Sequence, residues 1–262
     1  MRLGVIGYGA VAQALIERLG TVPVTEAVIL IRSGTLAAPS SSVRVRSVDS
    51  LSALLQTRPD LIVECAGHSA VVEHAEACLR AGTSLVALSL GAFADPLLLS
   101  RVQTAATDGR ARLIRPSGAI AGIDLIEALS LEGPVHIAYT GTKPPRALRG
   151  TPAEQWLDLT SLASPSVYFE GSARDAALLF PRTTNVVAAL ALAGPGFENV
   201  SVTLAADPAA TSNRHAYTLT AAGCKACFTI ESTAAAGNPR SSLTTVYSIL
   251  REVRAFAEQR GA

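Results

Sequence analysis

The first residues of the chain have the types and spacing of a phosphate-binding turn. The apolar run 1–6 ends directly at Gly7, and Gly9 and Ala12 complete a G-x-G-x-x-A pattern that opens a helical run. In this pattern the first glycine permits a tight turn, the second lets the backbone approach a pyrophosphate, and the small third residue keeps the helix close to the strand. The N–H groups at the start of the helix then bind the phosphates. The pattern predicts an NAD or NADP site; the alternative is an ordinary turn of small residues. The expected contacts are Gly7, Gly9, Ala10 and Val11.

The end of the second expected strand, 25–31, should bind the adenosine ribose. A site selective for NAD usually has Asp or Glu there, which accepts hydrogen bonds from the ribose hydroxyls. This chain has Arg32 and Ser33 instead, a cation and a hydrogen-bond donor that suit the 2′-phosphate of NADP. We therefore expect NADP to bind, without exclusion of NAD. In the alternative interpretation, Arg32 is a solvated charge at the rim.

The elements around this turn alternate between strand and helix. Strands are expected at 25–31, 60–65, 83–90 and 111–115, and helices at 47–57, 69–81 and 95–108. Apolar strands separated by helices indicate a parallel sheet covered on both faces, whose ligands bind beyond the carboxyl ends of the strands. The loops expected at that edge are 66–69, 89–92 and 116–119. From the first of them we expect cofactor contacts by Ala66, Gly67 and His68.

The second half of the chain changes to strand-like runs, several of which alternate with a period of two. Strands are expected at 135–142, 167–171, 200–205, 215–221 and 226–232, helices at 123–131, 174–180 and 185–193, and a long loop over 143–166 with one short helix near 153–159. The fold class is therefore α/β: a Rossmann-type dinucleotide-binding domain over 1–117, then an α+β catalytic domain on a mostly antiparallel sheet over 118–240.

A last helix is expected within 241–262. Its apolar stripe consists of Leu243, Val246, Tyr247, Leu250, Val253 and Ala257. Because such a stripe must be buried, we expect the helix to pack back on the first domain. One sheet face of the second domain then stays free for a contact between two copies, so a homodimer is expected.

Composition and charge narrow the class of protein. The chain has 262 residues, of which 49% are hydrophobic and 16% charged, with a formal net charge of +1. That charge gives no field for nucleic acid or an anionic membrane, and the longest apolar stretch, 186–196, is too short to span a bilayer. Met1 leads directly into the first strand, so we expect no leader and a cytoplasmic location.

The four cysteines, Cys65, Cys78, Cys224 and Cys227, are interpreted as free thiols in a reducing compartment. Residues 224–227 form a C-x-x-C, but no second pair and no histidine cluster completes a zinc site, and no metal is expected. A redox pair is the alternative interpretation of these two cysteines.

Eight short motifs, in this order and spacing, resemble L-aspartate dehydrogenases over essentially the whole chain. They occupy 64–68, 118–124, 139–144, 171–173, 180–186, 206–208, 213–215 and 238–242. The resemblance implies NAD(P)-dependent oxidative deamination of L-aspartate to oxaloacetate and ammonia through iminoaspartate, and the reverse amination. Two roles in the cell stay open: degradation of aspartate, or supply of iminoaspartate to NAD biosynthesis. The turn at 223–227 departs from the glycine-richer sequence of the family.

The resemblance also implies roles for single residues. His215 matches the active-site histidine of the family, and Ala119 and Asn185 match contacts on the nicotinamide side of the cofactor. Water must add to the imine carbon during the reaction, and a histidine near its usual pKa of about 6.5 can move the proton. From the residues alone, His215 can equally be a satisfied histidine at a strand end. His68 is the second candidate.

A dicarboxylic substrate needs cations. Lys143, Arg182 and Arg240 lie in motif-bearing loops and can bind the two carboxylates; solvated surface charge is the alternative for each. Asp207 either closes a turn before Pro208 or orients His215. The competing functions are a dihydrodipicolinate- or homoserine-type oxidoreductase on the same two-domain plan, and a non-enzymatic NAD(P)-sensing protein.

Overall fold

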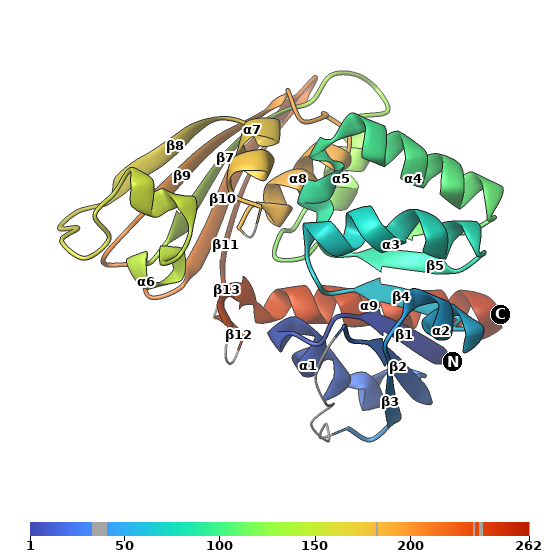
Figure 1. The fold of residues 1–262 in the computed structure, drawn as a ribbon. Coiled ribbons are helices and arrows are strands. Elements are labelled where there is room, and N and C mark those ends of the chain that lie inside the picture. The colour runs from blue at the N-terminus through green and yellow to red at the C-terminus, as the bar shows by residue number, and fades with distance from the viewer. Residues whose placement is uncertain (33–40, 182, 233, 236–237, 262) are drawn as a thin grey trace. The chain divides into compact units, whose positions relative to one another are not determined.

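The computed structural model describes residues 1–32, 41–181, 183–232, 234–235 and 238–261. Its contacts divide the chain into two compact units, Met1–Pro116 with Thr245–Ala262, and Ser117–Thr244 (Figure 1). The sequence-based boundaries, 117/118 and 240/241, differ from these by one and by four residues.

The first unit is built on a parallel sheet of order β3-β2-β1-β4-β5-β6. Its strands are β1 (Arg2–Ile6), β2 (Glu26–Leu30), β3 (Arg44–Val48), β4 (Leu61–Glu64), β5 (Ser84–Ala87) and β6 (Leu113–Ile114). Between them lie α1 (Ala10–Ile16), α2 (Leu51–Gln56), α3 (His68–Arg80) and α4 (Pro96–Asp108), with 3-10 turns at Leu19–Thr21 and Leu90–Ala94. Because the strand order reverses between β1 and β4, the carboxyl ends of these two strands form the switch point at which ligands bind in such sheets.

The helix predicted for 47–57 is partly wrong, because its first residues belong to the edge strand β3. Ser47 and Val48 pair with β2 instead, and α2 begins only at Leu51. Ser50 is the N-cap, as expected, and its hydroxyl accepts the N–H of Ala53 at 3.3 Å. The alternation in 44–48 is short and its residues are only partly buried, which makes the strand hard to recognise beside a helical pattern.

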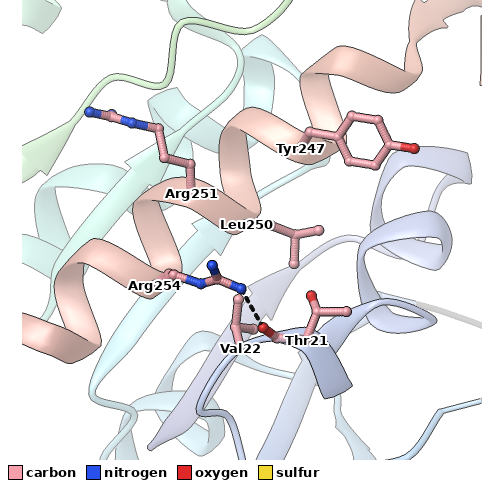
Figure 2. A pocket seen from close by; sticks show the side chains of 6 residues that line it. All are labelled: Thr21, Val22, Tyr247, Leu250, Arg251 and Arg254. Carbon is pink, nitrogen blue, oxygen red and sulfur yellow. Dashed lines mark hydrogen bonds between the residues drawn. The ribbon is translucent and has the colours of Figure 1, made fainter.

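Helix α9 (Leu243–Gly261) belongs to the first unit. Its buried apolar residues are Val246, Ile249, Val253 and Phe256, whereas Tyr247 of the predicted stripe is 51% exposed. The buried face is therefore rotated by about one residue from the predicted one. Figure 2 shows the flank that this leaves open, an open hollow of about 260 Å³ between α9 and Thr21–Val22, where Arg254 donates to the carbonyl of Thr21 at 2.7 Å.

The second unit contains a mixed five-stranded sheet of order β11-β10-β7-β9-β8. The strands are β7 (His136–Lys143), β8 (Ser166–Ser172), β9 (Val200–Ala206), β10 (Asn213–Ala221) and β11 (Cys224–Ser232), and the helices are α5 (Ile123–Leu129), α6 (Pro145–Leu148), α7 (Ala173–Leu179) and α8 (Asn185–Leu192). Only β7 and β9 are parallel, so the sheet is mostly antiparallel, as the sequence predicts. Helices α7 and α8 pack on β9.

Two segments of this unit differ from the prediction. The 143–166 segment has helical turns at Pro145–Leu148 and Pro152–Gln155 rather than one helix near 153–159. A small hairpin, β12 (Ala234–Ala235) with β13 (Asn238–Ser242), precedes α9, so this helix starts two residues later than predicted.

The C-x-x-C pair lies on one extended strand. Cys224 and Cys227 are three positions apart in β11, so their side chains point to opposite faces of the sheet, with Cα atoms about 10 Å apart. A disulfide needs Cα atoms within about 7 Å. Both are free thiols, as are Cys65 and Cys78, and the redox-pair interpretation is wrong for this conformation. No helix within the described ranges combines the length and apolar character needed to cross a membrane.

Candidate functional site

The glycine turn has the geometry that a dinucleotide requires. Gly7 has φ +92°, and a Cβ there would lie 2.7 Å from Cβ of Ala66, so only glycine fits between the ends of β1 and β4. Gly9 is the N-cap of α1, has no side-chain cap, and leaves open space around the position of a Cβ. A pyrophosphate can therefore approach the backbone at Gly9. Ala10 and Val11 form the first turn of α1 beside it.

The loop after β4 is held by a buried carboxylate. Glu64 has no exposed surface, and its Oε1 accepts the N–H groups of Ala66 at 2.8 Å and Gly67 at 2.7 Å. The same carboxylate accepts the Ser89 hydroxyl at 2.9 Å and the N–H groups of Leu88 at 3.2 Å and Ser89 at 3.0 Å. One side chain thus fixes the backbone at the carboxyl ends of both β4 and β5. Glu64 falls in the 64–68 motif, but its sequence context predicts no role for it.

The predicted cofactor residues of the first unit lie around these strand ends. Ala66 is exposed, and Gly67, with φ +110°, precedes His68, which is half-buried in the first turn of α3. Arg32 follows β2, its side chain is 69% exposed, and its Nη1 lies 3.9 Å from a carboxylate oxygen of Glu73. Ser33 lies outside the described residues.

Two predicted cofactor residues belong to the second unit. Ala119 is buried in the loop before α5, and Asn185 is the first residue of α8. The Ala119 loop is anchored because the Tyr217 hydroxyl donates to the carbonyl of Ala121 at 2.5 Å. Next to it, Gly122 is left-handed, and a Cβ there would lie 2.6 Å from the Phe228 ring.

A second cluster lies on the buried face of β7 and β10. His215 is 4% exposed, and its Nδ1 is 2.7 Å from the hydroxyl of Tyr139. Lys143, on the same face of β7, is 6% exposed. Burial and then the Lys143 charge lower the pKa of His215 to about 3. The expectation that His215 titrates near neutrality is therefore wrong for the ligand-free protein, in which the imidazole is neutral.

Of the other polar residues predicted for the site, some lie near His215 and others do not. The carboxylate of Asp207 accepts the N–H of Ala209 at 2.8 Å, so it closes its own turn, and the side chain that contacts Nδ1 of His215 is Tyr139. Among the cations, Lys143 lies with His215, whereas Arg182 and the side chain of Arg240, in β13, lie outside the described residues. Of the other histidines, His74 is buried in α3 and His136 is exposed on β7.

The role of Tyr139 beside His215 was not predicted, although the residue spacing in β7 contains a signal for it. With a period of two, Tyr139, Gly141 and Lys143 share one face of β7, and His215 lies opposite Gly141 on β10. Only the strand register brings this face together with His215. Within the described part of the chain, no group of His, Cys, Asp or Glu side chains has the arrangement of a metal site.

The buried histidine makes the stability of the second unit dependent on pH. Its folded pKa, about 3, lies below the usual 6.5, so protons favour the unfolded chain. The stabilisation is complete above pH 6.5 and is lost as the pH falls toward 3, by at most about 1.4 kcal/mol per pH unit. We expect urea unfolding between pH 6.5 and 4.5 to show a smaller loss of stability for His215→Gln than for the wild type. Equal losses in the two proteins would contradict this origin.

Comparison with known proteins agrees with this geometry. A family model described as aspartate dehydrogenase, C-terminal, matches residues 124–256, and one described as homoserine dehydrogenase, NAD binding domain, matches residues 7–116. The L-aspartate dehydrogenase of Ralstonia nicotianae is 40% identical over 96% of both chains, and that of Ruegeria pomeroyi is 39% identical over 100% of this chain and 93% of its own.

Solved structures give the same result. The crystal structure of aspartate dehydrogenase from Thermotoga maritima has a TM-score of 0.80 and 30% identity, and it covers 97% of this chain and 96% of its own. A dihydrodipicolinate reductase from Paenisporosarcina, at 16% identity and a TM-score of 0.51, covers 97% of this chain and 95% of its own and shares the fold alone. The near-complete coverage at 40% identity, together with the match over 124–256, shows that the chain belongs to the aspartate dehydrogenase family.

Proposed function

We propose that the chain is an NAD(P)-dependent L-aspartate dehydrogenase that converts L-aspartate and water to oxaloacetate and ammonia, and catalyses the reverse amination. The observation that carries the proposal is the buried pair of Lys143 and His215 in a family member with an intact dinucleotide turn. When bound, NAD(P)+ supplies the hydride acceptor. The residues of the chain bind the substrate and move its protons.

Lys143 and His215 suit the two demands of this substrate. The Lys143 ammonium offers a carboxylate of aspartate a partner in a site with little water, where the attraction is strong. A bound substrate carboxylate offsets the Lys143 charge and raises the pKa of His215 from its low ligand-free value. His215 then takes a proton from the water that attacks the imine carbon and returns one to the departing amine. Substrate binding thus makes the histidine a stronger base.

The experiment is a substrate panel with the purified protein. L-aspartate with NADP or NAD should give reduced cofactor and ammonia in equal amounts, whereas glutamate, homoserine and malate should react far more slowly. Homoserine belongs in the panel because the family model that matches the first unit has that dehydrogenase in its description. Absence of activity in both directions, under conditions in which cofactor binding is measured, would refute the proposal.

The cofactor preference follows from Arg32. We expect Arg32→Ala to weaken NADP binding about tenfold to a hundredfold and NAD binding far less. The reason is that only NADP has a 2′-phosphate, whose charged hydrogen bond to Arg32 is worth about 1.5–3 kcal/mol. Fluorescence titration of both cofactors measures this. Glu73→Gln is the matched control, since it removes the carboxylate 3.9 Å from Arg32 without removing the cation, and should not weaken NADP binding. Equal losses for both cofactors in Arg32→Ala would place Arg32 away from the ribose.

We also propose a homodimer that forms through the outer face of the second sheet. Apart from His136 and Arg214 at the ends of these strands, this face exposes small, uncharged residues, including Ala138 and Thr140 on β7 and Thr220 on β10, while the opposite face is buried. A sheet buried on one side with such an outer face suits a second copy of the chain. Sedimentation should give a dimer for the wild type and monomers for Thr140→Glu. Leu97→Glu on α4, a site 71% exposed, should stay dimeric, and a monomeric wild type would refute the proposal.

The four free thiols support a reducing compartment, and we propose that the protein is cytoplasmic. Cell fractionation with antibody detection tests this; recovery of the protein outside the cytoplasmic fraction would refute it.

A further inference from the structure

The register of β7 and β10 brings one tyrosine diagonally across to His215. Gly141 pairs directly with His215, and Tyr139 pairs with Tyr217, two positions along the same face. Diagonal neighbours in an antiparallel pair have Cα atoms about 7–8 Å apart, within reach of an aromatic side chain. The Tyr139 ring uses this reach: its centroid lies 6.1 Å from that of His215, and its hydroxyl lies 2.7 Å from Nδ1.

Gly141 provides the space for this contact. A Cβ at Gly141 would lie 2.8 Å from the Tyr139 hydroxyl and 3.0 Å from Cε1 of the same ring. Its φ is not in the left-handed region, so the backbone accepts alanine; the restriction is first the room for Tyr139 and then Cδ2 of Leu204, 3.2 Å from the same Cβ position. A larger residue between the tyrosine and the histidine would push the hydroxyl away from Nδ1. This need for space explains physically why the 139–144 motif has a glycine at position 141.

The environment suits a neutral partner for the imidazole. Tyr139 is 3% exposed, and burial raises its pKa far above the usual value, so the hydroxyl keeps its proton. A hydroxyl can donate to Nδ1 or accept from it. It can therefore hold the ring in place both when His215 is neutral and when it is protonated. A carboxylate at this position would stabilise the imidazolium strongly, whereas the hydroxyl leaves the base strength to the bound substrate.

We propose that Tyr139 is a positioning residue for His215: by holding Nδ1 through the space left by Gly141, it fixes the orientation of the imidazole and leaves Nε2 to meet the reacting molecule. The expected effect of Tyr139 on catalysis rests on the proposed function. The hydrogen bond between Tyr139 and His215, and its effect on the imidazole ring, do not.

Tyr139→Phe tests the proposal with two independent readouts. In ligand-free protein with ¹⁵N-labelled histidine, the Nδ1 resonance of His215, identified by its absence in His215→Gln, should shift when the hydroxyl is removed. In steady-state kinetics, kcat should fall about tenfold or more, while KM for aspartate and cofactor affinity change less than twofold. Tyr247→Phe is the control: Tyr247 lies on α9 in the other unit and is 51% exposed, and the change should move neither readout.

Gly141→Ala tests the space itself. It should reproduce the resonance shift and the loss of kcat, although the tyrosine hydroxyl is still present in the chain. In a Tyr139→Phe background the same substitution should have little further effect on kcat, because the contact that it disrupts has already been removed. Independent, multiplicative losses would show that Gly141 acts in another way and would count against the proposal.

The outcomes separate this proposal from the proposed function. An unchanged Nδ1 resonance in Tyr139→Phe would overturn the positioning role, whatever the activity. A shifted resonance in a wild-type protein that does not turn over aspartate would refute the function and leave the hydrogen bond intact. A shifted resonance with kcat within twofold of an active wild type would overturn the catalytic importance of the positioning.

Discussion

Replacement of His215 by alanine is expected to lower kcat for aspartate oxidation by about a hundredfold to ten-thousandfold, the usual contribution of one general acid–base group. The physical reason is that water must lose a proton as it attacks the imine carbon. His215 is a buried histidine beside Lys143, and its lowered pKa of about 3 keeps the imidazole neutral in the ligand-free protein. Cofactor affinity should change little, because the glycine turn belongs to another unit of the chain. Steady-state kinetics and a fluorescence titration measure the two effects.

His215→Asn is the informative companion to this variant. Asparagine retains a hydrogen-bonding side chain on β10 but cannot carry a proton at neutral pH, so its kcat should be almost as low as that of alanine. If His215→Asn keeps most of the turnover, the histidine is needed only for hydrogen bonding. If His215→Ala does so, the proton moves elsewhere, and His68 at the start of α3 is the next residue to test.

Features set by residues close together in sequence could be predicted, whereas contacts between residues far apart in sequence could not. The glycine turn was predictable because a strand, three small residues and a helix are adjacent in sequence, and each has its own steric reason. The strands of the second sheet were predictable because alternation with a period of two is local as well. The chemistry of His215 was not. Its partners Tyr139 and Lys143 are more than 70 positions away in sequence, and only the β7–β10 register brings Tyr139 to it.

The pKa of His215 shows the same limit. A histidine at a strand entrance is expected to titrate near 6.5, and the sequence contains no sign of the burial and the lysine charge that lower this value to about 3. Edge strand β3 was missed for another reason, because its five residues are too few and too polar to compete with a helical pattern. Glu64 was visible in a motif, but its five hydrogen bonds come from two loops that only the parallel sheet brings together.

Glu64→Leu is expected to destabilise the first unit by at least about 3 kcal/mol, because each buried donor left without a partner costs about 1–3 kcal/mol. Four backbone N–H groups and the Ser89 hydroxyl now share this carboxylate, and leucine accepts from none of them. A loss of this size should lower the melting temperature by about 6 °C or more. Thermal unfolding followed by circular dichroism measures it.

The same variant should also weaken cofactor binding, because the N–H groups of Ala66 and Gly67 fix the loop against which Gly7 packs. Ser89→Ala is the matched control: it removes one hydroxyl from the cluster but leaves every backbone donor satisfied, so its loss should be a fraction of that for leucine. Glu64→Gln should fall between them, since its carbonyl oxygen still accepts while its NH₂ group faces donors. If Glu64→Leu melts within 2 °C of the wild type and binds cofactor equally well, water must replace the carboxylate at little cost. The loop after β4 would then be held by the packing of Ala66 against Gly7 and by the hydrogen bond from the N–H of Cys65 to the carbonyl of Ile6, and Gly7→Ala should be the more damaging change.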